Sequence, residues 1–316
     1  MRSRNPIRRV CQLSLDGDTN RIYILFVVSF TAQTMAFQRA LESARPTESR
    51  LFTDPLATRF LSPPLRALAG MARIPVAGSL VARLYDLAFP GPRPSAVART
   101  RLIDDTIVEL VAGGVRDIVV LGAGFDSRPW RLPELRGARI VEVDRAGTQA
   151  VKAAAVRAAG VDTGRVGFLP VDFETDDLAT ALRAGGVGER RTLFVWEGVT
   201  NYLTAAAVDR TLAVLRRVGG PDGMLVFTYV HAGVIDGTAT FPEAERWLRG
   251  VARVGEPWTF GLDPDRLGAF LAARGYELIW EQSTAAAGDR YFRPRGRADR
   301  ASELYRVALA RIACPA

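Results

Sequence analysis

Short apolar segments alternate with segments of helical periodicity over residues 96–230, and this alternation restricts the chain to few folds. Five apolar segments are expected to be strands: residues 117–122, 138–144, 166–173, 192–198 and 223–230. Helices are expected before and between them, over residues 97–114, 146–160, 176–186 and 205–220. Strands that are apolar throughout and joined by helices are typical of a parallel sheet covered on both faces. The sequence therefore predicts an α/β fold.

The rest of the chain is assigned around this core. The further elements expected are a helix over residues 263–275 and three strands that finish the sheet with an antiparallel pair, over residues 276–283, 289–292 and 302–312. Residues 29–95 show no clear strand pattern, and we expect them to form a helical lid over the binding edge. No repeat or Gly/Ser linker interrupts residues 29–316, so we interpret them as one domain with residues 96–316 as its α/β core.

The first 28 residues are interpreted as an extension of doubtful status. Basic residues at the start precede an apolar stretch at residues 22–30, which resembles a signal peptide. Asp16 and Asp18 lie between the two parts, and the apolar stretch is too short to span a bilayer. We therefore expect a cytoplasmic protein without a membrane partner.

Composition excludes several classes of function. The formal net charge is +8, but Lys152 is the only lysine and the arginines are scattered, so we expect no nucleic-acid partner. His231 is the only histidine, and the two cysteines, Cys11 and Cys314, lie near opposite ends of the chain. Zinc sites built on several His or Cys ligands are thereby excluded, and we expect no metal. The G-x-S-x-G motif of α/β-hydrolases is absent.

Polar residues and glycines follow the predicted strands, where ligands of parallel sheets bind. Gly122 and Gly124 follow the first strand, and an acid, Asp144, lies about twenty residues further on, as in dinucleotide-binding proteins. Ser127 occupies the place of the third glycine of that fingerprint, and this weakens the expected grip on a pyrophosphate. A nucleoside with a cationic tail and no phosphate fits better, and S-adenosyl-L-methionine is such a molecule. Asp126 is interpreted as a turn residue.

Two further acids follow later strands. Asp172 is placed to accept a hydrogen bond from an adenine amino group, with the Phe173 backbone at the ring edge, and Glu197 is placed near a sulfonium. Each has a structural alternative, since Asp172 could cap the following helix and Glu197 could be a solvated or ion-paired acid.

The segments ARTRLIDD, VVLGAGFDSRPWRL, VEVD, VDFET and EGVTNYL occur in this order. As an ordered set they resemble the leucine carboxyl methyltransferase family, and in particular its bacterial branch of S-adenosylmethionine-dependent O-methyltransferases. The resemblance extends from about residue 29 to the C-terminus. It implies a Rossmann-like class I methyltransferase fold: a mostly parallel seven-stranded sheet with an antiparallel C-terminal strand and an N-terminal helical lid.

The resemblance also implies roles for individual residues. Arg101 would pair with the methionine carboxylate, and Gly122 and Gly124 would line the cofactor. Asp144 would hold the ribose and Glu197 would lie near the methionine amino group or sulfonium. The remaining pair, Asp172 and Phe173, would hold the adenine.

Methyl transfer needs an oxygen nucleophile held in line with the methyl carbon. The expected acceptor is the carboxylate or hydroxyl of a small molecule, with secondary metabolism as its source. His231 follows the fifth strand and is the candidate general base, and Tyr202 and Tyr229 are candidates to line the acceptor pocket. Two alternatives stay open: an NAD-dependent oxidoreductase and a non-catalytic protein that binds S-adenosylmethionine. The missing Tyr-x-x-x-Lys pair argues against the oxidoreductase.

Overall fold

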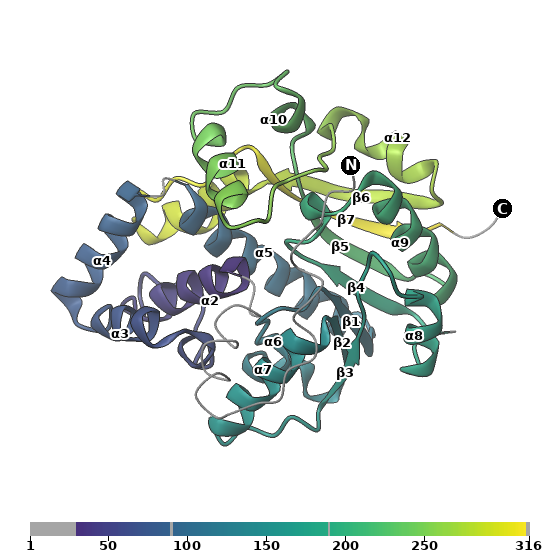
Figure 1. Ribbon diagram of the computed structural model, residues 1–316, viewed down its shortest axis with the longest axis horizontal. Coiled ribbons are helices and arrows are strands. Elements are labelled where there is room, and N and C mark those ends of the chain that lie inside the picture. Colours follow the sequence, from purple (N-terminus) through teal and green to yellow (C-terminus); the bar gives the residue numbers. More distant parts are fainter. Residues whose placement is uncertain (1–29, 89–90, 189, 314–316) are drawn as a thin grey trace, which may run out of the picture.

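A seven-stranded sheet runs through the middle of the molecule and has helices on both faces (Figure 1). The computed structural model describes residues 30–88, 91–188 and 190–313. The strands follow the order β3-β2-β1-β4-β5-β7-β6. Their bounds are β1 Asp117–Leu121, β2 Arg139–Asp144, β3 Val166–Pro170, β4 Thr192–Trp196, β5 Met224–Val230, β6 Tyr276–Ser283 and β7 Tyr305–Ile312. Strands β1 to β5 pair in parallel, and β7 is antiparallel to both β5 and β6. The predicted fold class is confirmed.

Helices of the core cover the two faces of this sheet. The α-helices are α5 Pro92–Ala112, α6 Arg128–Arg131, α7 Ala146–Ala158, α8 Leu178–Ala184, α9 Ala205–Val218, α10 Ala232–Asp236, α11 Ala244–Arg253, α12 Leu267–Ala272 and α13 Thr284–Phe292. Short 3₁₀ helices are η3 Pro133–Gly137, η4 Thr200–Tyr202, η5 Pro264–Arg266 and η6 Arg293–Arg295. Figure 1 shows α8, α9 and α12 on one face and α5, α6 and α7 on the other.

The strand residues divide between two apolar cores according to the twofold alternation of a strand. In β1, Val119 and Leu121 pack with the helices α8, α9 and α12, whereas Ile118 and Val120 pack with α5 and α13. All five residues of β1 are buried. Both sides of the central strands must therefore be apolar, which explains why these segments lack the polar alternation of a half-exposed strand.

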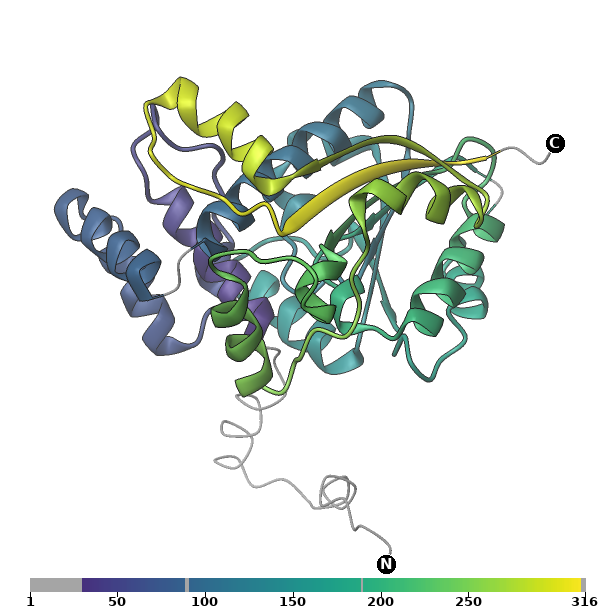
Figure 2. The same ribbon diagram turned by 90° about the horizontal axis from the view of Figure 1, so that it is seen from above.

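The described residues before α5 form helices and no strand. The helices are α2 Phe30–Ser43, η2 Ala57–Phe60, α3 Pro63–Met71 and α4 Pro75–Ala88. Helices α3 and α4 lie at the end of the molecule away from α8 and α9, and α2 lies between them and the sheet (Figures 1 and 2). A third apolar cluster joins Phe37 and Leu41 of α2 to Phe125 after β1 and Val156 of α7.

One predicted strand is wrong. Residues 289–292 belong to α13, because Ser283 caps this helix by accepting from the Ala286 N–H. Tyr291 and Phe292 then pack against α5 in the second core. The expectations about residues 1–28 lie outside the described residues. Within the described ranges, no helix has both the length and the apolar character needed to cross a membrane.

Candidate functional site

The loop after β1 is shaped by two glycines. Gly122 has φ +62° and Gly124 has φ +45°, the left-handed region that favours glycine. A Cβ on Gly122 would lie 2.3 Å from Val199 Cγ2, so the loop packs against the segment after β4 too closely for a side chain. The Gly124 N–H donates to Asp144 Oδ2 at 2.6 Å. The geometry therefore places the Asp144 carboxylate directly beside the glycine loop.

Asp144 retains room for a ligand. Its Oδ1 accepts from the Arg145 N–H at 2.7 Å, so each oxygen has one backbone donor. A carboxylate has about four acceptor positions, which leaves two for the vicinal hydroxyls of a ribose. The glycine loop thus holds the Asp144 carboxylate in position at the end of β2.

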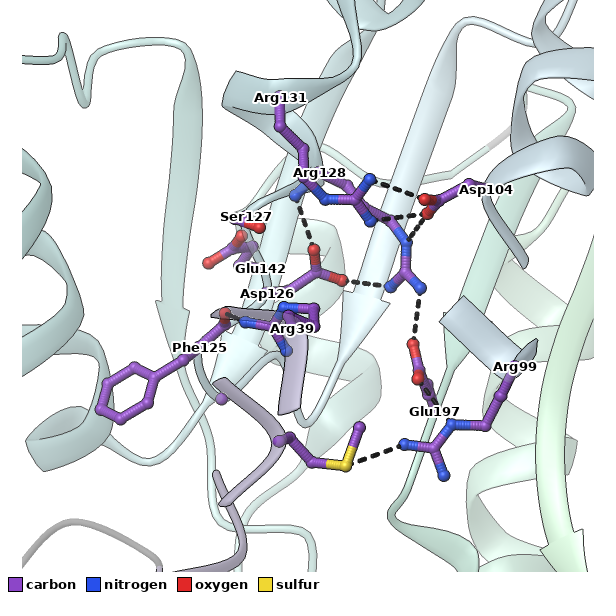
Figure 3. A network of polar contacts seen from close by, with 12 residues as sticks. Arg39, Arg99, Asp104, Phe125, Asp126, Ser127, Arg128, Arg131, Glu142 and Glu197 are labelled. Carbon is purple, nitrogen blue, oxygen red and sulfur yellow. Dashed lines mark hydrogen bonds and ion pairs between the residues drawn. The ribbon is translucent and has the colours of Figure 1, made fainter. Parts of the chain in front are cut away.

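Arg128 is the centre of a buried ion network that the sequence did not reveal (Figure 3). Its guanidinium contacts Asp104 at 2.7 Å, Asp126 at 2.6 Å and Glu197 at 2.8 Å. Asp104 also pairs with Arg131 at 2.6 Å. Burial by itself would raise the pKa of Asp126, but Arg128 holds that pKa well below its usual range. Asp126 is therefore a fixed charge that helps to hold Arg128, and not a simple turn residue.

Glu197 lies after β4 and is bound between two arginines. Its Oε1 accepts from Arg99 Nε at 2.7 Å while its Oε2 faces Arg128. Burial opposes ionisation, yet Arg128 and Arg99 together lower the pKa of Glu197. The Arg99 guanidinium also lies over the Tyr305 ring, 4.7 Å from its centroid. Of the two structural alternatives for Glu197, the structure shows the ion-paired one.

Arg101 is not brought to this cluster. Its guanidinium donates to the Leu51 carbonyl at 2.9 Å and pairs with Asp105 at 2.9 Å on the same helix. Two residues along a helix turn about 200°, so Arg99 and Arg101 point in nearly opposite directions. Arg99 and Ile103 are one turn apart on the buried face of α5. The apolar periodicity of this helix could therefore have predicted that Arg99 lies on its buried face.

Asp172 and Phe173 follow β3, next to the end of β2. Asp172 forms an ion pair with Arg145 at 3.2 Å and accepts from the Glu174 N–H at 3.0 Å. The N-cap of α8 is Asp177, so Asp172 does not cap that helix. Phe173 is half-buried against the first core. Both residues lie at the strand end where they were predicted.

His231 and Tyr202 occupy different settings. His231 caps α10, because its Nδ1 accepts from the Gly233 N–H at 3.0 Å. A neutral imidazole has one acceptor nitrogen, so this bond leaves Nε2 as an N–H donor. Burial raises the pKa of Tyr202 to about 12, and its hydroxyl is therefore protonated near neutral pH. Tyr229 is fully buried, and its hydroxyl donates to Glu281 at 3.0 Å.

A buried amide near this cluster has an unpartnered donor. The Tyr305 hydroxyl lies 3.4 Å from Asn201 Oδ1, and the Trp258 ring contacts the Tyr305 ring edge-on with centroids 6.2 Å apart. Asn201 Nδ2 is buried, and within the described part of the chain it has no hydrogen-bond partner. Buried polar groups are nearly always paired, so an orphaned donor beside Tyr305 and Arg99 indicates a place for an acceptor atom.

Helix α2 is tied to the same loop. Arg39 donates to the Phe125 carbonyl at 2.5 Å and to Asp54 Oδ2 at 2.8 Å. Asp54 also accepts from the Ser127 hydroxyl at 2.6 Å. Ala32 lies 3.6 Å from the position of a Cβ on Gly124. The N-terminal helices are therefore bonded to the glycine loop and do not merely lie over it.

Comparisons with known proteins identify the family of this chain. The family model for leucine carboxyl methyltransferase matches residues 32–216. This chain belongs to that family. A Frankia alni protein assigned by name to the S-adenosyl-L-methionine-dependent methyltransferases is 33% identical over 239 residues, which cover 73% of this chain and 80% of the relative. A Streptomyces coelicolor protein with the same assignment is 32% identical over 253 residues, or 78% and 82% of the two chains. The predicted family is confirmed.

A solved structure supports the fold. A Thermobifida fusca protein, named as a methyltransferase, superposes with a TM-score of 0.56 at 17% identity and covers 87% of this chain and 97% of its own. At this identity the likeness establishes the fold alone. The leucine carboxyl methyltransferase family member described here has that Rossmann-like fold, with the polar cluster at the carboxyl ends of its parallel strands.

Proposed function

We propose that this protein transfers the methyl group of S-adenosyl-L-methionine to an oxygen atom of a small-molecule acceptor. Membership of a methyltransferase family supports the reaction class and the cofactor. The observation that carries the proposal is the set formed by Asp144, Arg99 and Glu197 around the glycine loop. One carboxylate suits the ribose, and an opposite-charge pair suits the zwitterionic end of the cofactor.

The assignments of individual residues follow from charge. In our proposal Arg99, in place of Arg101, binds the methionine carboxylate, and Glu197 binds the amino group. A guanidinium and a carboxylate that already face each other can each exchange part of their contact for the opposite charge of an amino acid. Asp144 accepts from the ribose hydroxyls, while Asp172 and Phe173 contact the adenine.

The cofactor supplies a methyl carbon that its sulfonium already activates. The protein then has to hold an oxygen in line with that carbon, and positioning of this kind contributes about 7–11 kcal/mol. Asn201 Nδ2 is an unpartnered donor next to Tyr305, whose ring lies under Arg99, and it favours an acceptor that offers oxygen lone pairs. We assign this donor to acceptor binding.

A carboxylate is the acceptor oxygen that fits best. It is ionised at neutral pH and needs no general base. The alternative, a hydroxyl, would need one, and neither predicted candidate is suited to remove its proton. Nδ1 of His231 is used by the α10 cap, and Tyr202 is protonated. We therefore assign His231 a capping role and Tyr202 a role in lining the pocket.

The dinucleotide alternative has less support. The Ser127 hydroxyl, at the place of the third glycine, is bonded to Asp54. The helix that follows the loop, α6, has only four residues, so it offers a pyrophosphate little helix dipole. A non-catalytic binding protein would share the cofactor site, and only a methylated product distinguishes it from the enzyme.

Calorimetric titration with S-adenosylhomocysteine and, separately, with NADH tests the cofactor. S-adenosylhomocysteine is expected to bind the wild type, to bind Asp144→Ala and Arg99→Met much more weakly, and to bind Arg101→Met as well as the wild type. Chemical unfolding of each variant checks that weaker binding is not loss of fold. Binding of NADH alone would refute the methyltransferase proposal, and equal affinities of Arg99→Met and Arg101→Met would refute the assignment of Arg99.

Transfer of a labelled methyl group to a panel of small carboxylic acids and phenols tests the acceptor. Base-labile product, as expected of a methyl ester, supports the carboxylate. Labelled phenol ethers and no esters would contradict that choice. Cofactor binding without any labelled product would favour the non-catalytic alternative.

A further inference from the structure

Exposed apolar side chains gather on one part of the molecule. Six of the nine exposed large hydrophobic residues of the described chain lie on α3, α4 and the turn between them: Leu68, Met71, Ile74, Leu80, Leu84 and Leu87. Their exposed fractions run from 37% to 65%. We call this segment, residues 63–88, the outer hairpin. Both ribbon views place it at the periphery of the molecule (Figures 1 and 2).

Helix α4 carries two neighbouring apolar stripes, one that faces inward and one that is exposed. Val81 and Tyr85 turn inward, where Tyr85 contacts the Phe37 ring at 5.7 Å and accepts from Gln38 at 2.7 Å. Leu80, Leu84 and Leu87 have the i, i+4, i+7 spacing of a second stripe, which is exposed. The apolar stripe of a surface helix normally packs against a neighbouring element, and no described residue covers this outer stripe.

The outer hairpin is also basic. It contains three arginines, Arg66, Arg73 and Arg83, and one acid, Asp86. Asp86 is neutralised by Arg93 of α5, which contacts it through Nη2. Arg73 and Arg83 are exposed, and neither forms an ion pair within the described residues. Arg83 lies within the apolar stripe of α4, since it follows Leu80 by three residues.

We propose, in contrast to the absence of a membrane partner expected from the sequence, that the outer hairpin docks on an anionic lipid surface. Leucine, isoleucine and methionine with interspersed arginines, and no free carboxylate, form the side-chain set of helices that lie in a membrane interface. The arginines are complementary to anionic headgroups. In an isologous contact between two copies, each hairpin would offer arginines and no unpaired acid, because Asp86 is already paired with Arg93. Contact of this kind needs no helix that crosses the membrane.

Helix α2 connects the outer hairpin to the candidate site, so docking of the hairpin would act on the site through this helix. Gln38 of this helix bonds Tyr85 of the hairpin, and its neighbour Arg39 bonds the Phe125 carbonyl in the glycine loop. The outer hairpin and the glycine loop are thus linked by hydrogen bonds through α2. This inference rests on exposure and charge, and it holds whether or not the proposed methyl transfer is correct.

Vesicle co-sedimentation of the full chain tests the proposal. The probes are vesicles of phosphatidylcholine alone and of phosphatidylcholine with phosphatidylglycerol. The wild type is expected to bind the anionic vesicles and to be released by salt. The double variant Leu80→Glu/Leu84→Glu is expected to bind about tenfold or more weakly, and Arg73→Glu/Arg83→Glu similarly. Ile279→Glu, at a 43% exposed position on β6, is the matched control and should bind as the wild type does.

Light scattering and chemical unfolding accompany the binding assay. Because residues 1–29 are the same in every variant, differences among the variants report on the outer hairpin alone. Equal binding of the wild type and Leu80→Glu/Leu84→Glu, with both folded, would overturn the proposal, as would no binding to anionic vesicles. A dimer that Leu80→Glu/Leu84→Glu dissociates, without vesicle binding, would replace the lipid surface with a second copy of the chain.

Discussion

Replacing Gly122 by alanine should destabilise the protein by about 2–5 kcal/mol. Two costs contribute to this figure. A left-handed backbone with a Cβ costs roughly 1–2 kcal/mol, and φ at this position is +62°. Overpacking costs roughly 1–3 kcal/mol more, because the new Cβ would lie 2.3 Å from Val199 Cγ2.

Gly124→Ala is the matched control. Its φ of +45° carries the same backbone cost, but its Cβ would lie 3.6 Å from Ala32, which is ordinary contact. It should therefore lose only about 1–2 kcal/mol. Urea unfolding followed by circular dichroism gives the free energy of unfolding for each variant.

A double variant separates the two costs. In Gly122→Ala/Val199→Ala the clash is relieved while the backbone strain stays. The double variant should thus be about 1–3 kcal/mol more stable than the sum of the single effects predicts. Equal losses for Gly122→Ala and Gly124→Ala, together with additive effects in the cycle, would refute this account of the loop.

Three further predictions concern the ion pair between Glu142 of β2 and Lys152 of α7, and the cap of α10. Burial raises the pKa of Glu142 from 4.5 to about 7, although Lys152 opposes this shift. The folded state therefore binds a proton more tightly than the unfolded state does. The stability that this proton contributes is fully present below about pH 4.5 and is lost as the pH rises to about 7. Unfolding at pH 5 and pH 8 should show this loss in the wild type and not in Glu142→Gln. Lys152→Met should lower the free energy of unfolding by about 3–5 kcal/mol at pH 8, where Glu142 is charged, and by much less at pH 5. The control Arg249→Met removes one partner of an exposed ion pair and should lower it by less than about 0.5 kcal/mol at either pH. Equal losses of stability in the two variants would contradict the role of the buried pair. His231→Ala should lose about 0.5–2 kcal/mol and His231→Asn only a few tenths, by urea unfolding, and unchanged stability in His231→Ala would argue against the cap.

The sheet could be predicted because each strand is marked by a short run of apolar residues that are consecutive in the sequence. The central strands β1, β4 and β5 are buried on both faces, and each of the residues Gly122, Asp144, Asp172 and Glu197 stands at or just after the end of a parallel strand. Parallel topology then forces these ends to one edge. The strand predicted at residues 289–292 was wrong because four residues show too little periodicity to distinguish a helix from a strand. In the structure these residues are the end of the helix that Ser283 caps.

The buried arginines could not be predicted in the same way. Arg128 is surrounded by three carboxylates that come from α5, the glycine loop and the end of β4. Nothing in the sequence near residue 128 shows that these distant acids converge. The burial of Arg99 could be predicted, since it has the helical phase of Ile103 and Ile107, whereas the resemblance to the family pointed to Arg101.

Helix α2 separates the glycine loop, where sequence changes would be poorly tolerated, from the outer hairpin, where they would be tolerated. Its inner side is constrained by the bond from Arg39 to the Phe125 carbonyl, so changes there would disturb the glycine loop. Its outer side meets the rest of the N-terminal helices through contacts such as Gln38 with Tyr85. Exchange of residues 63–88 between relatives should therefore alter what the protein associates with while cofactor affinity is retained, whereas a fragment that begins after α2 would lack one wall of its own binding loop.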